Sequence, residues 1–230
     1  MNLEYIIPTF SFLWFSGIII SLFIGFFVIQ LAIRIPPDKR KILRLSIGFL
    51  MLIEETFNQI YMYRLGLWTT STSLPIHLCG ITGILAGLMM IRNKQIGFEF
   101  ILMPGFAGAL HALLTPQLNH GGDFYQIINY YVGHSGIILV AFYLTIVEGY
   151  RLRKFSWIKS FLIIQILMVF VGFSNWILDA NYMYLCKPPL VDSPLIRGDW
   201  PWYLLFFEFL GLAHILVLYL SFRKMKPLPY

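Results

Sequence analysis

Long apolar runs alternate with short polar or charged connections along almost the whole chain. A helix that crosses the hydrocarbon layer of a bilayer needs roughly 20 predominantly apolar residues, and seven segments approach that length. None of the connections is long enough to form a soluble domain. The pattern therefore predicts an all-α fold, a polytopic membrane helix bundle with seven transmembrane helices in one domain over residues 1–230. The predicted spans are residues 12–33, 43–63, 74–91, 98–114, 127–148, 158–178 and 202–222.

Composition supports a membrane protein over a soluble one. Hydrophobic residues make up 58% of the chain and charged residues only 12%, whereas about a quarter of residues are charged in soluble domains. The net charge of +6 does not indicate a nucleic-acid partner, because the basic residues lie in short loops between apolar runs. We expect no cleavable signal peptide, because the first ten residues contain Glu4 and no Lys or Arg.

The distribution of basic residues predicts the orientation. Fourteen of the 17 Lys and Arg residues lie at or next to the connections after the first, third and fifth spans and in the C-terminal tail. Lys and Arg favour the cytoplasmic side of a membrane. The N-terminus is therefore expected outside and the C-terminus in the cytoplasm, in a multi-pass protein of the plasma membrane.

Polar side chains within the spans gather toward the predicted outer ends, whereas the inner halves are mostly Leu, Ile, Val and Phe. Polar groups inside a membrane are costly, so such a gathering points to a function. Glu54 and Glu55 mark its inner limit. The pattern predicts a polar cavity that faces outward. The candidate residues are Asn58, Gln59, His77, Cys79, His111, Thr115, His134, Asn175, Asp179, Asn181, Tyr182 and Glu208.

Cys79 is a candidate nucleophile. A thiol needs a base, and His77 is only two residues away, a spacing at which helical side chains do not face each other. The base is therefore expected from another helix, with His134 first and His111 second. Two other interpretations of Cys79 stay open: a small residue on a packing face, or a disulfide with Cys186.

Other polar residues have both functional and structural interpretations. Asn175 and Asp179 share a helix face, and could orient the base, bind substrate or clamp two helices together. A metal set of His77, His111, His134 and Asp179 is conceivable, but none of these pairs has the spacing typical of a helical metal motif, so we predict no metal and no cofactor. His120 and His214 are expected to be incidental.

Several stretches resemble the YwaF-like bacterial integral membrane family. LPIHLC, residues 74–79, resembles the LPxHxC-type motif of that family. The resemblance extends from the third predicted span to the last. Its further stretches are GFAGALHALLTP (105–116), HSG (134–136), VEGY (147–150), NW (175–176), NYMYLC (181–186) and WPWY (200–203).

This family is similar to the animal transmembrane protein 164 family, and the resemblance implies a lipid-remodelling acyltransferase with a catalytic Cys at Cys79. The first hypothesis is therefore an intramembrane lipid acyltransferase or acyl hydrolase of a bacterial membrane. Its substrates would be membrane phospholipids, and no obligatory protein partner is expected. His134 or His111 would move the proton. His77, Asn175, Asp179, Asn181, Tyr182 and Glu208 are the candidate substrate-binding residues.

Two alternatives do not involve covalent catalysis. A seven-helix protein with an outward polar pocket would also suit a small-ligand-binding or transport protein. Helices broken at depth, or an inverted repeat, would favour transport, and the sequence indicates neither. A structural role as an assembly partner would rely on small-residue faces such as Cys79, Gly83 and Gly87.

Overall fold

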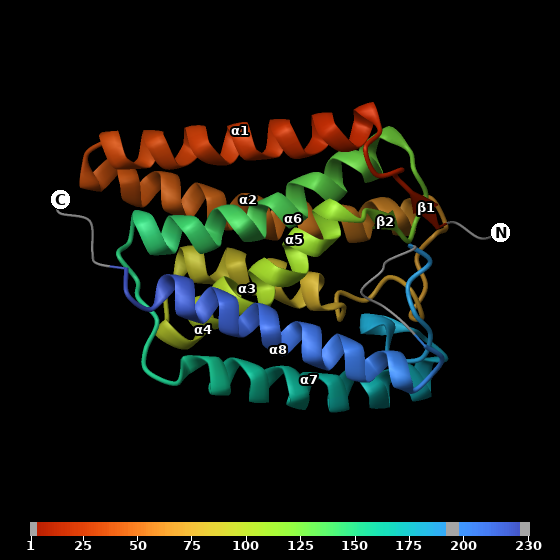
Figure 1. Cartoon of the computed structure of the whole chain (residues 1–230). Coiled ribbons are helices and arrows are strands. Elements are labelled where there is room, and N and C mark those ends of the chain that lie inside the picture. Colours follow the sequence, from red (N-terminus) through yellow and green to blue (C-terminus); the bar gives the residue numbers. More distant parts are fainter. Residues whose placement is uncertain (1–3, 192–197, 226–230) are drawn as a thin grey trace.

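A computed structural model describes residues 4–191 and 198–225, and most of this part of the chain is helical. Two short strands, β1 (Tyr5–Ile6) and β2 (Gln117–Leu118), pair antiparallel at one end of the molecule (Figure 1). We call this the strand end. The helices are α1 (Phe12–Arg34), α2 (Pro37–Arg64), α3 (Leu78–Ile91), α4 (Gln95–Phe100), the π-helical η1 (Ile101–Gly105), α5 (Phe106–Leu114), α6 (Phe124–Ile146), α7 (Ser156–Leu178), the 3-10 turn η2 (Tyr182–Tyr184) and α8 (Trp202–Phe222).

Five helical segments in the described chain are long and apolar enough to cross a membrane, so the protein is an all-helical, multi-pass membrane protein. They are α1, the continuous segment α4–η1–α5, α6, α7 and α8. α3 is apolar but has only 14 residues, and α2 carries basic residues at its start and Glu54 and Glu55 near its middle. The predicted helix bounds hold best for α8, which covers 202–222 as expected.

α3 begins at Leu78, four residues later than predicted. The preceding residues form a tight turn in which the Ile76 N–H donates to the Leu74 carbonyl at 2.8 Å. Gly80 allows this turn to lie against the first turn of α3, because a Cβ at Gly80 would come within 2.9 Å of the Pro75 carbonyl oxygen. The turn places His77 at the helix N-cap and Cys79 in the first turn.

The fourth predicted span contains an interruption that the sequence did not indicate. Proline lacks an N–H and its ring crowds the carbonyl four residues earlier. Around Pro104 the helix widens to a π turn, in which the Phe106 N–H donates to the Ile101 carbonyl. The segment therefore continues past the proline as one buried rod, with its backbone still bonded.

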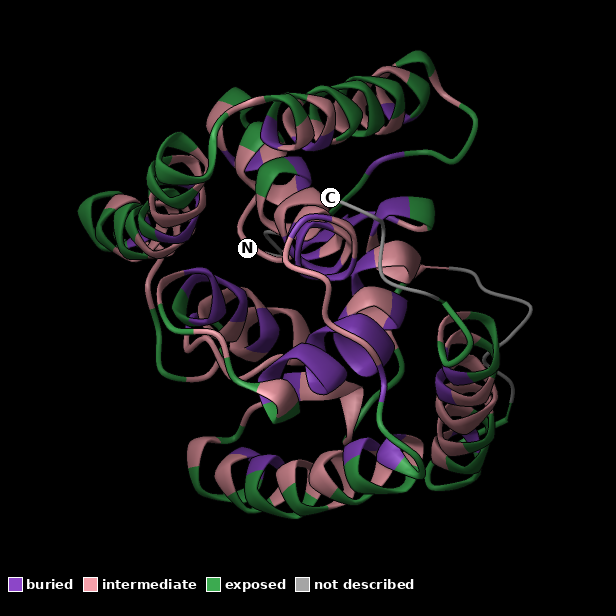
Figure 2. Ribbon diagram, turned by 90° about the vertical axis from the view of Figure 1, so that its left-hand side faces the viewer, coloured by how far each residue is buried: buried purple, intermediate pink, exposed green. Residues whose placement is uncertain are grey.

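The helices run back and forth between the strand end and the opposite end (Figure 1). The central segment α4–η1–α5 packs against α6 and α8, α2 lies along α3, and α1 packs mainly on α6. Seen from one end, buried residues concentrate in the middle of the bundle, and exposed residues lie on the outward faces of the peripheral helices (Figure 2). Many of these exposed side chains are apolar, as expected where the solvent is lipid.

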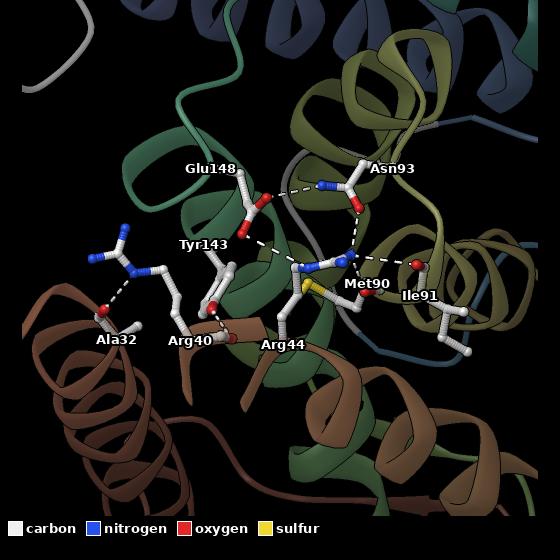
Figure 3. Close-up of polar contacts among 8 residues, drawn as sticks. All are labelled: Ala32, Arg40, Arg44, Met90, Ile91, Asn93, Tyr143 and Glu148. Atoms are coloured by element: carbon white, nitrogen blue, oxygen red, sulfur yellow. Dashed lines mark hydrogen bonds and ion pairs between the residues drawn. The ribbon is translucent and has the colours of Figure 1, made fainter. Parts of the chain in front are cut away.

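Arginine side chains close the end opposite the strands. The carbonyls of a last helical turn lack intrahelical partners, and they lie at the negative end of the helix dipole. Arg40 donates to the Ala32 carbonyl of α1 at 3.0 Å, and Arg44 donates to the Met90 and Ile91 carbonyls of α3 (Figure 3). Arg44 also forms an ion pair with Glu148 at 3.8 Å. These contacts join the start of α2 to the ends of α1 and α3 and to the connection after α6.

A second ion pair lies at the same end, and its carboxylate is more deeply buried than that of Glu148. The Glu99 side chain is 1% exposed, and Arg153 donates to both of its carboxylate oxygens, at 2.8 and 2.7 Å. Gln95 donates to the same carboxylate at 2.9 Å. Glu99 thereby fixes the connection between α6 and α7 against the start of the central segment α4–η1–α5.

We predict that Arg153→Leu lowers stability, because it leaves the buried Glu99 carboxylate without its cationic partner. Breaking a buried pair costs about 3–5 kcal/mol, and the half-exposed position of Arg153 reduces this to about 2 kcal/mol. Thermal unfolding in detergent measures the effect. Lys159→Leu, which removes an exposed positive charge from α7, is the control. Equal melting temperatures for the two variants would contradict the assigned role.

Candidate active site

A cavity of about 520 Å³ lies between the helices and reaches the loops of the strand end. Side chains from α2, α3, α5, α6, α7 and α8 contribute to its lining. Seven of the twelve candidate residues are among the lining residues: Asn58, His77, Cys79, His111, Thr115, His134 and Glu208. Residues that are far apart in the sequence therefore share one enclosed space.

Cys79 enters this space from the first turn of α3. Its thiol is free, and so is that of Cys186, so the disulfide considered from the sequence is not formed. Gly108 of α5 faces this thiol, since a Cβ at this glycine would stand in van der Waals contact with the Cys79 sulfur, at 3.7 Å. The small-residue faces of the two helices thus place the thiol at the cavity wall.

His134 presents a basic nitrogen to the cavity. Its Nδ1 lies 2.7 Å from the Tyr130 carbonyl oxygen, so Nδ1 carries the proton and donates it to that oxygen. In the neutral ring this leaves a lone pair on Nε2, the atom that can accept a proton. The Tyr130 ring packs against the His134 ring, with ring centroids 4.2 Å apart. Tyr130 is also close enough to Cys79 for the two side chains to interact electrostatically. The Tyr130 carbonyl, not the predicted Asn175 or Asp179, orients this histidine.

His77 has the opposite arrangement. Its Nδ1 accepts a hydrogen bond from the Met183 N–H at 3.1 Å, so the neutral ring carries its proton on Nε2. His77 therefore offers a hydrogen-bond donor, whereas His134 offers an acceptor. Both rings line the same cavity. Acyl chemistry requires one base and one hydrogen-bond donor, and these two tautomers can supply them.

A second histidine pair lies in the lining. The Nε2 atoms of His111 on α5 and His214 on α8 are 3.0 Å apart. The Nδ1 of His214 lies 2.7 Å from the Leu210 carbonyl oxygen, so this nitrogen carries a proton. When both rings are neutral, His111 must donate to His214 through Nε2. His214 therefore sets the tautomer of His111 and is not incidental to the site.

His120 also belongs to the lining, where its Nε2 lies 3.0 Å from the Ser73 hydroxyl. Burial lowers the pKa of His120, which favours the neutral ring. Tyr184, from the loop that follows α7, lines the cavity as well. Burial, and then the neighbouring Cys79 and Glu4, raise the pKa of Tyr184 to about 12, so its phenol stays protonated.

Four predicted binding residues lie outside the described lining: Asn175, Asp179, Asn181 and Tyr182. Asn175 is buried, and its side-chain amide pairs with the N–H and the carbonyl of Tyr182, at 2.8 and 2.9 Å. The Tyr182 hydroxyl accepts from the Leu74 N–H and donates to the Thr70 carbonyl, both at 2.9 Å.

Asn181 accepts from the N–H groups of Cys186 and Lys187, and Asp179 is an exposed residue at the end of α7. Together with Asn175 and Tyr182, Asn181 holds the loop over the site. This loop in turn supplies Tyr184 and the Met183 N–H that fixes His77.

Sequence reasoning missed several lining residues, among them Tyr130, Asn119, Gln126 and Asn129. Tyr130 is four residues before His134 on one helix face, and this spacing could have indicated it. In the described part of the chain, no group of three or more His, Cys, Asp or Glu side chains is arranged to hold a metal ion.

One comparison with known proteins decides the family. The model of the TMEM164 family matches residues 5–219, which is nearly the whole chain. This protein belongs to the TMEM164 family. No curated protein and no solved structure matches it. The matched range includes all the cavity residues discussed above, so this TMEM164-family site lies within the region that the family shares.

We predict that the two thiols of this TMEM164-family protein differ in access. Cys186 is exposed, whereas Cys79 is partly buried in the cavity wall. A bulky polyethylene-glycol maleimide should therefore label folded protein once, at Cys186, and small N-ethylmaleimide should label both, with Cys79 slower. Intact mass measures the labels, with Cys79→Ala and Cys186→Ala as matched controls. Equal rates with the bulky reagent would contradict the placement of Cys79.

Proposed function

We propose that this TMEM164-family protein is an intramembrane lipid acyltransferase or acyl hydrolase that uses Cys79 as its nucleophile. One observation supports this most: Cys79, His134 and His77 line one cavity, and the two histidines have opposite tautomers, one with a free acceptor nitrogen and one with a free N–H. The proposal needs the Cys79 thiol, the His134 lone pair and the His77 N–H to reach the same ester, and all three residues line the cavity that would hold it. The family resemblance on the LPIHLC stretch points to the same cysteine.

The reaction begins with transfer of the Cys79 proton to Nε2 of His134. The thiolate attacks the ester carbonyl carbon of a phospholipid, and the His77 Nε2–H donates to the oxyanion that forms. The carbon–oxygen bond of the ester then breaks, and the proton on His134 passes to the departing lysolipid oxygen. In the second half of the reaction, a lysolipid hydroxyl or a water attacks the thioester carbon while His134 takes its proton. The carbon–sulfur bond then breaks and the proton returns to the Cys79 sulfur, so a lysolipid gives transfer and water gives hydrolysis.

The walls contributed by α7 and α8 suit an acyl chain. They are mostly apolar, apart from His214 and Glu208 on α8, and Glu208 accepts a hydrogen bond from Gln165 at 2.6 Å. Gly211 on α8 faces open space, since a Cβ there would meet no atom within 4 Å. The apolar residues of these walls are Phe161, Ile164, Met168, Phe207, Leu210 and Ile215.

The membrane placement completes the proposal. α2 and α3 cross the bilayer together with the five apolar segments, which makes seven spans. The end closed by arginines faces the cytoplasm, since most basic residues lie there. The N-terminus and the cavity mouth face outward, toward the outer leaflet of a bacterial plasma membrane. α2 fits this role because Glu54 and Glu55 line the cavity and do not face lipid.

A second candidate is a ligand-binding or transport protein, and the π turn at Pro104 favours it. Irregular helix turns at depth often mark functional sites, and Pro104 lines the cavity. Solute uptake into proteoliposomes that is undiminished by Cys79→Ala would support this candidate over the acyltransferase.

We predict that Cys79→Ala abolishes acyl exchange between a labelled phospholipid and a lysophospholipid, and also abolishes release of fatty acid. His134→Gln should reduce the rate by about 10²–10⁴-fold, the usual contribution of a general base. Mass spectrometry of lipids after incubation with protein in vesicles measures both products. Cys186→Ala, which removes the other thiol, should retain the wild-type rate. Turnover that survives in Cys79→Ala would refute the mechanism.

We predict that Gly211→Phe shifts the acyl preference toward shorter chains. The new ring fills open space beside α7 and α8, and each methylene that can no longer be buried costs about 0.8 kcal/mol. Competition among phospholipids of graded chain length measures the shift. Gly25→Phe is the matched control, because Gly25 on α1 also faces open space but does not line the cavity. An unchanged profile in Gly211→Phe would place the chain elsewhere.

A further inference from the structure

The part of the cavity formed by α2, the start of α6 and the loop before α6 has unsatisfied hydrogen-bonding groups. In the described chain, buried side-chain atoms without a partner include Oδ1 of Asn58, Oδ1 of Asn119 and Nε2 of Gln126. All three residues line the cavity, and Gln126 is only 7% exposed. We call these three residues the amide compartment.

Buried polar groups without partners are costly, so three of them around one space point to a ligand that satisfies them. A carboxamide has both an acceptor oxygen and a donor nitrogen. Partners for three such groups must also be able both to donate and to accept. Hydroxyl groups do both, whereas a quaternary ammonium does neither.

The charges around the compartment exclude an anionic ligand group. No Lys or Arg is among the described residues that line the cavity. The neighbouring wall of α2 contributes Glu54 and Glu55, and the Glu54 carboxylate lies 3.6 Å from where a Cβ on Gly133 would stand. A phosphate beside the Glu55 carboxylate would be repelled, and no Lys or Arg in the described lining could pair with it. The ligand group in this compartment is therefore uncharged or cationic.

Other hydrogen bonds keep the compartment in place without using its free atoms. The Tyr61 hydroxyl of α2 donates to Asp123, the N-cap of α6, at 3.3 Å. The Asp123 side chain also accepts from the Gln126 backbone N–H at 3.1 Å. Tyr125 packs against Tyr61 with ring centroids 4.1 Å apart. The two helices are thus joined beside the amides, and the side-chain Nε2 of Gln126 stays available.

We propose that the amide compartment binds the hydroxyl groups of a lipid headgroup, such as a terminal glycerol or a sugar, and so selects hydroxyl-bearing lipids. The identity of the ligand as a lipid rests on the proposed function. The headgroup lies between α2 and α6, and the ester lies at Cys79. The acyl chain extends between α7 and α8. The phosphate, where there is one, lies outside the compartment.

Binding is measured on Cys79→Ala protein, so that catalysis does not enter the result. Native mass spectrometry in detergent compares lipids with identical acyl chains and with glycerol, hexose, ethanolamine or choline headgroups. We expect the glycerol and hexose lipids to bind about tenfold more tightly than the choline lipid, which corresponds to the gain of one or two hydrogen bonds. Gln126→Leu added to this protein should remove that preference and leave the choline lipid unaffected.

Gln30→Leu, the same change on α1 outside the lining, is the control and should retain the preference. Asn58→Leu tests the compartment from a second helix in case Gln126→Leu does not fold. Equal binding of all headgroups, or tightest binding of the ethanolamine lipid, would overturn the proposal. If the wild-type protein shows no turnover but a headgroup preference depends on Gln126, the headgroup proposal stands and the acyltransferase proposal is refuted. If the wild-type protein turns lipid over but no headgroup preference exists, the acyltransferase proposal stands and the headgroup proposal is refuted.

Discussion

Every backbone N–H and carbonyl within a bilayer must find its partner inside the protein, and this constraint governs the whole molecule. It explains why the chain is helical throughout its apolar length. It also explains the π turn at Pro104, where the helix widens and its backbone stays bonded past a residue that cannot donate. Polar side chains within the helices can then lie only where protein surrounds them, and most of them lie around one cavity.

The two ends of the bundle meet this constraint in different ways. At the end opposite the strands, Arg40 and Arg44 donate hydrogen bonds to helix carbonyls, and Arg153 pairs with the carboxylate of Glu99. At the strand end, Asn175 and Tyr182 hydrogen-bond to each other and so close the site. Several side chains that line the cavity, among them Asn58 and Gln126, instead have atoms without a hydrogen-bond partner. His134 and His77 each have one nitrogen held by the backbone and one available. The end opposite the strands is therefore held by internal contacts, whereas several side chains that line the cavity keep unpaired hydrogen-bonding atoms.

Periodicity and charge predicted the helical fold and most helix bounds, because those properties depend on local sequence. α3 was placed too early because its start depends on Gly80 lying against Pro75, a contact that apolarity does not indicate. Polar residues near outer helix ends predicted His77, Cys79, His111 and His134 as neighbours of one space.

The same reasoning could not separate lining residues from residues that hold a loop, since both are polar and both lie near the strand end. Asn175 and Tyr182 proved to bond to each other. His214 looked isolated on its own helix, and only the packing of α8 beside α5 shows its partner, His111. Pairings between helices depend on tertiary packing, which a single sequence does not encode locally.

The central claim is that Cys79 carries the acyl group during turnover, and the mass of the intact protein tests it most directly. Wild-type protein would be incubated with one phospholipid of defined chains, quenched in acid and measured before and after neutral hydroxylamine. The account predicts an added mass equal to one acyl group, located on Cys79, removed by hydroxylamine and absent from Cys79→Ser. Turnover of the lipid with no acylated protein at any time, or with the acyl group on another residue, would contradict it.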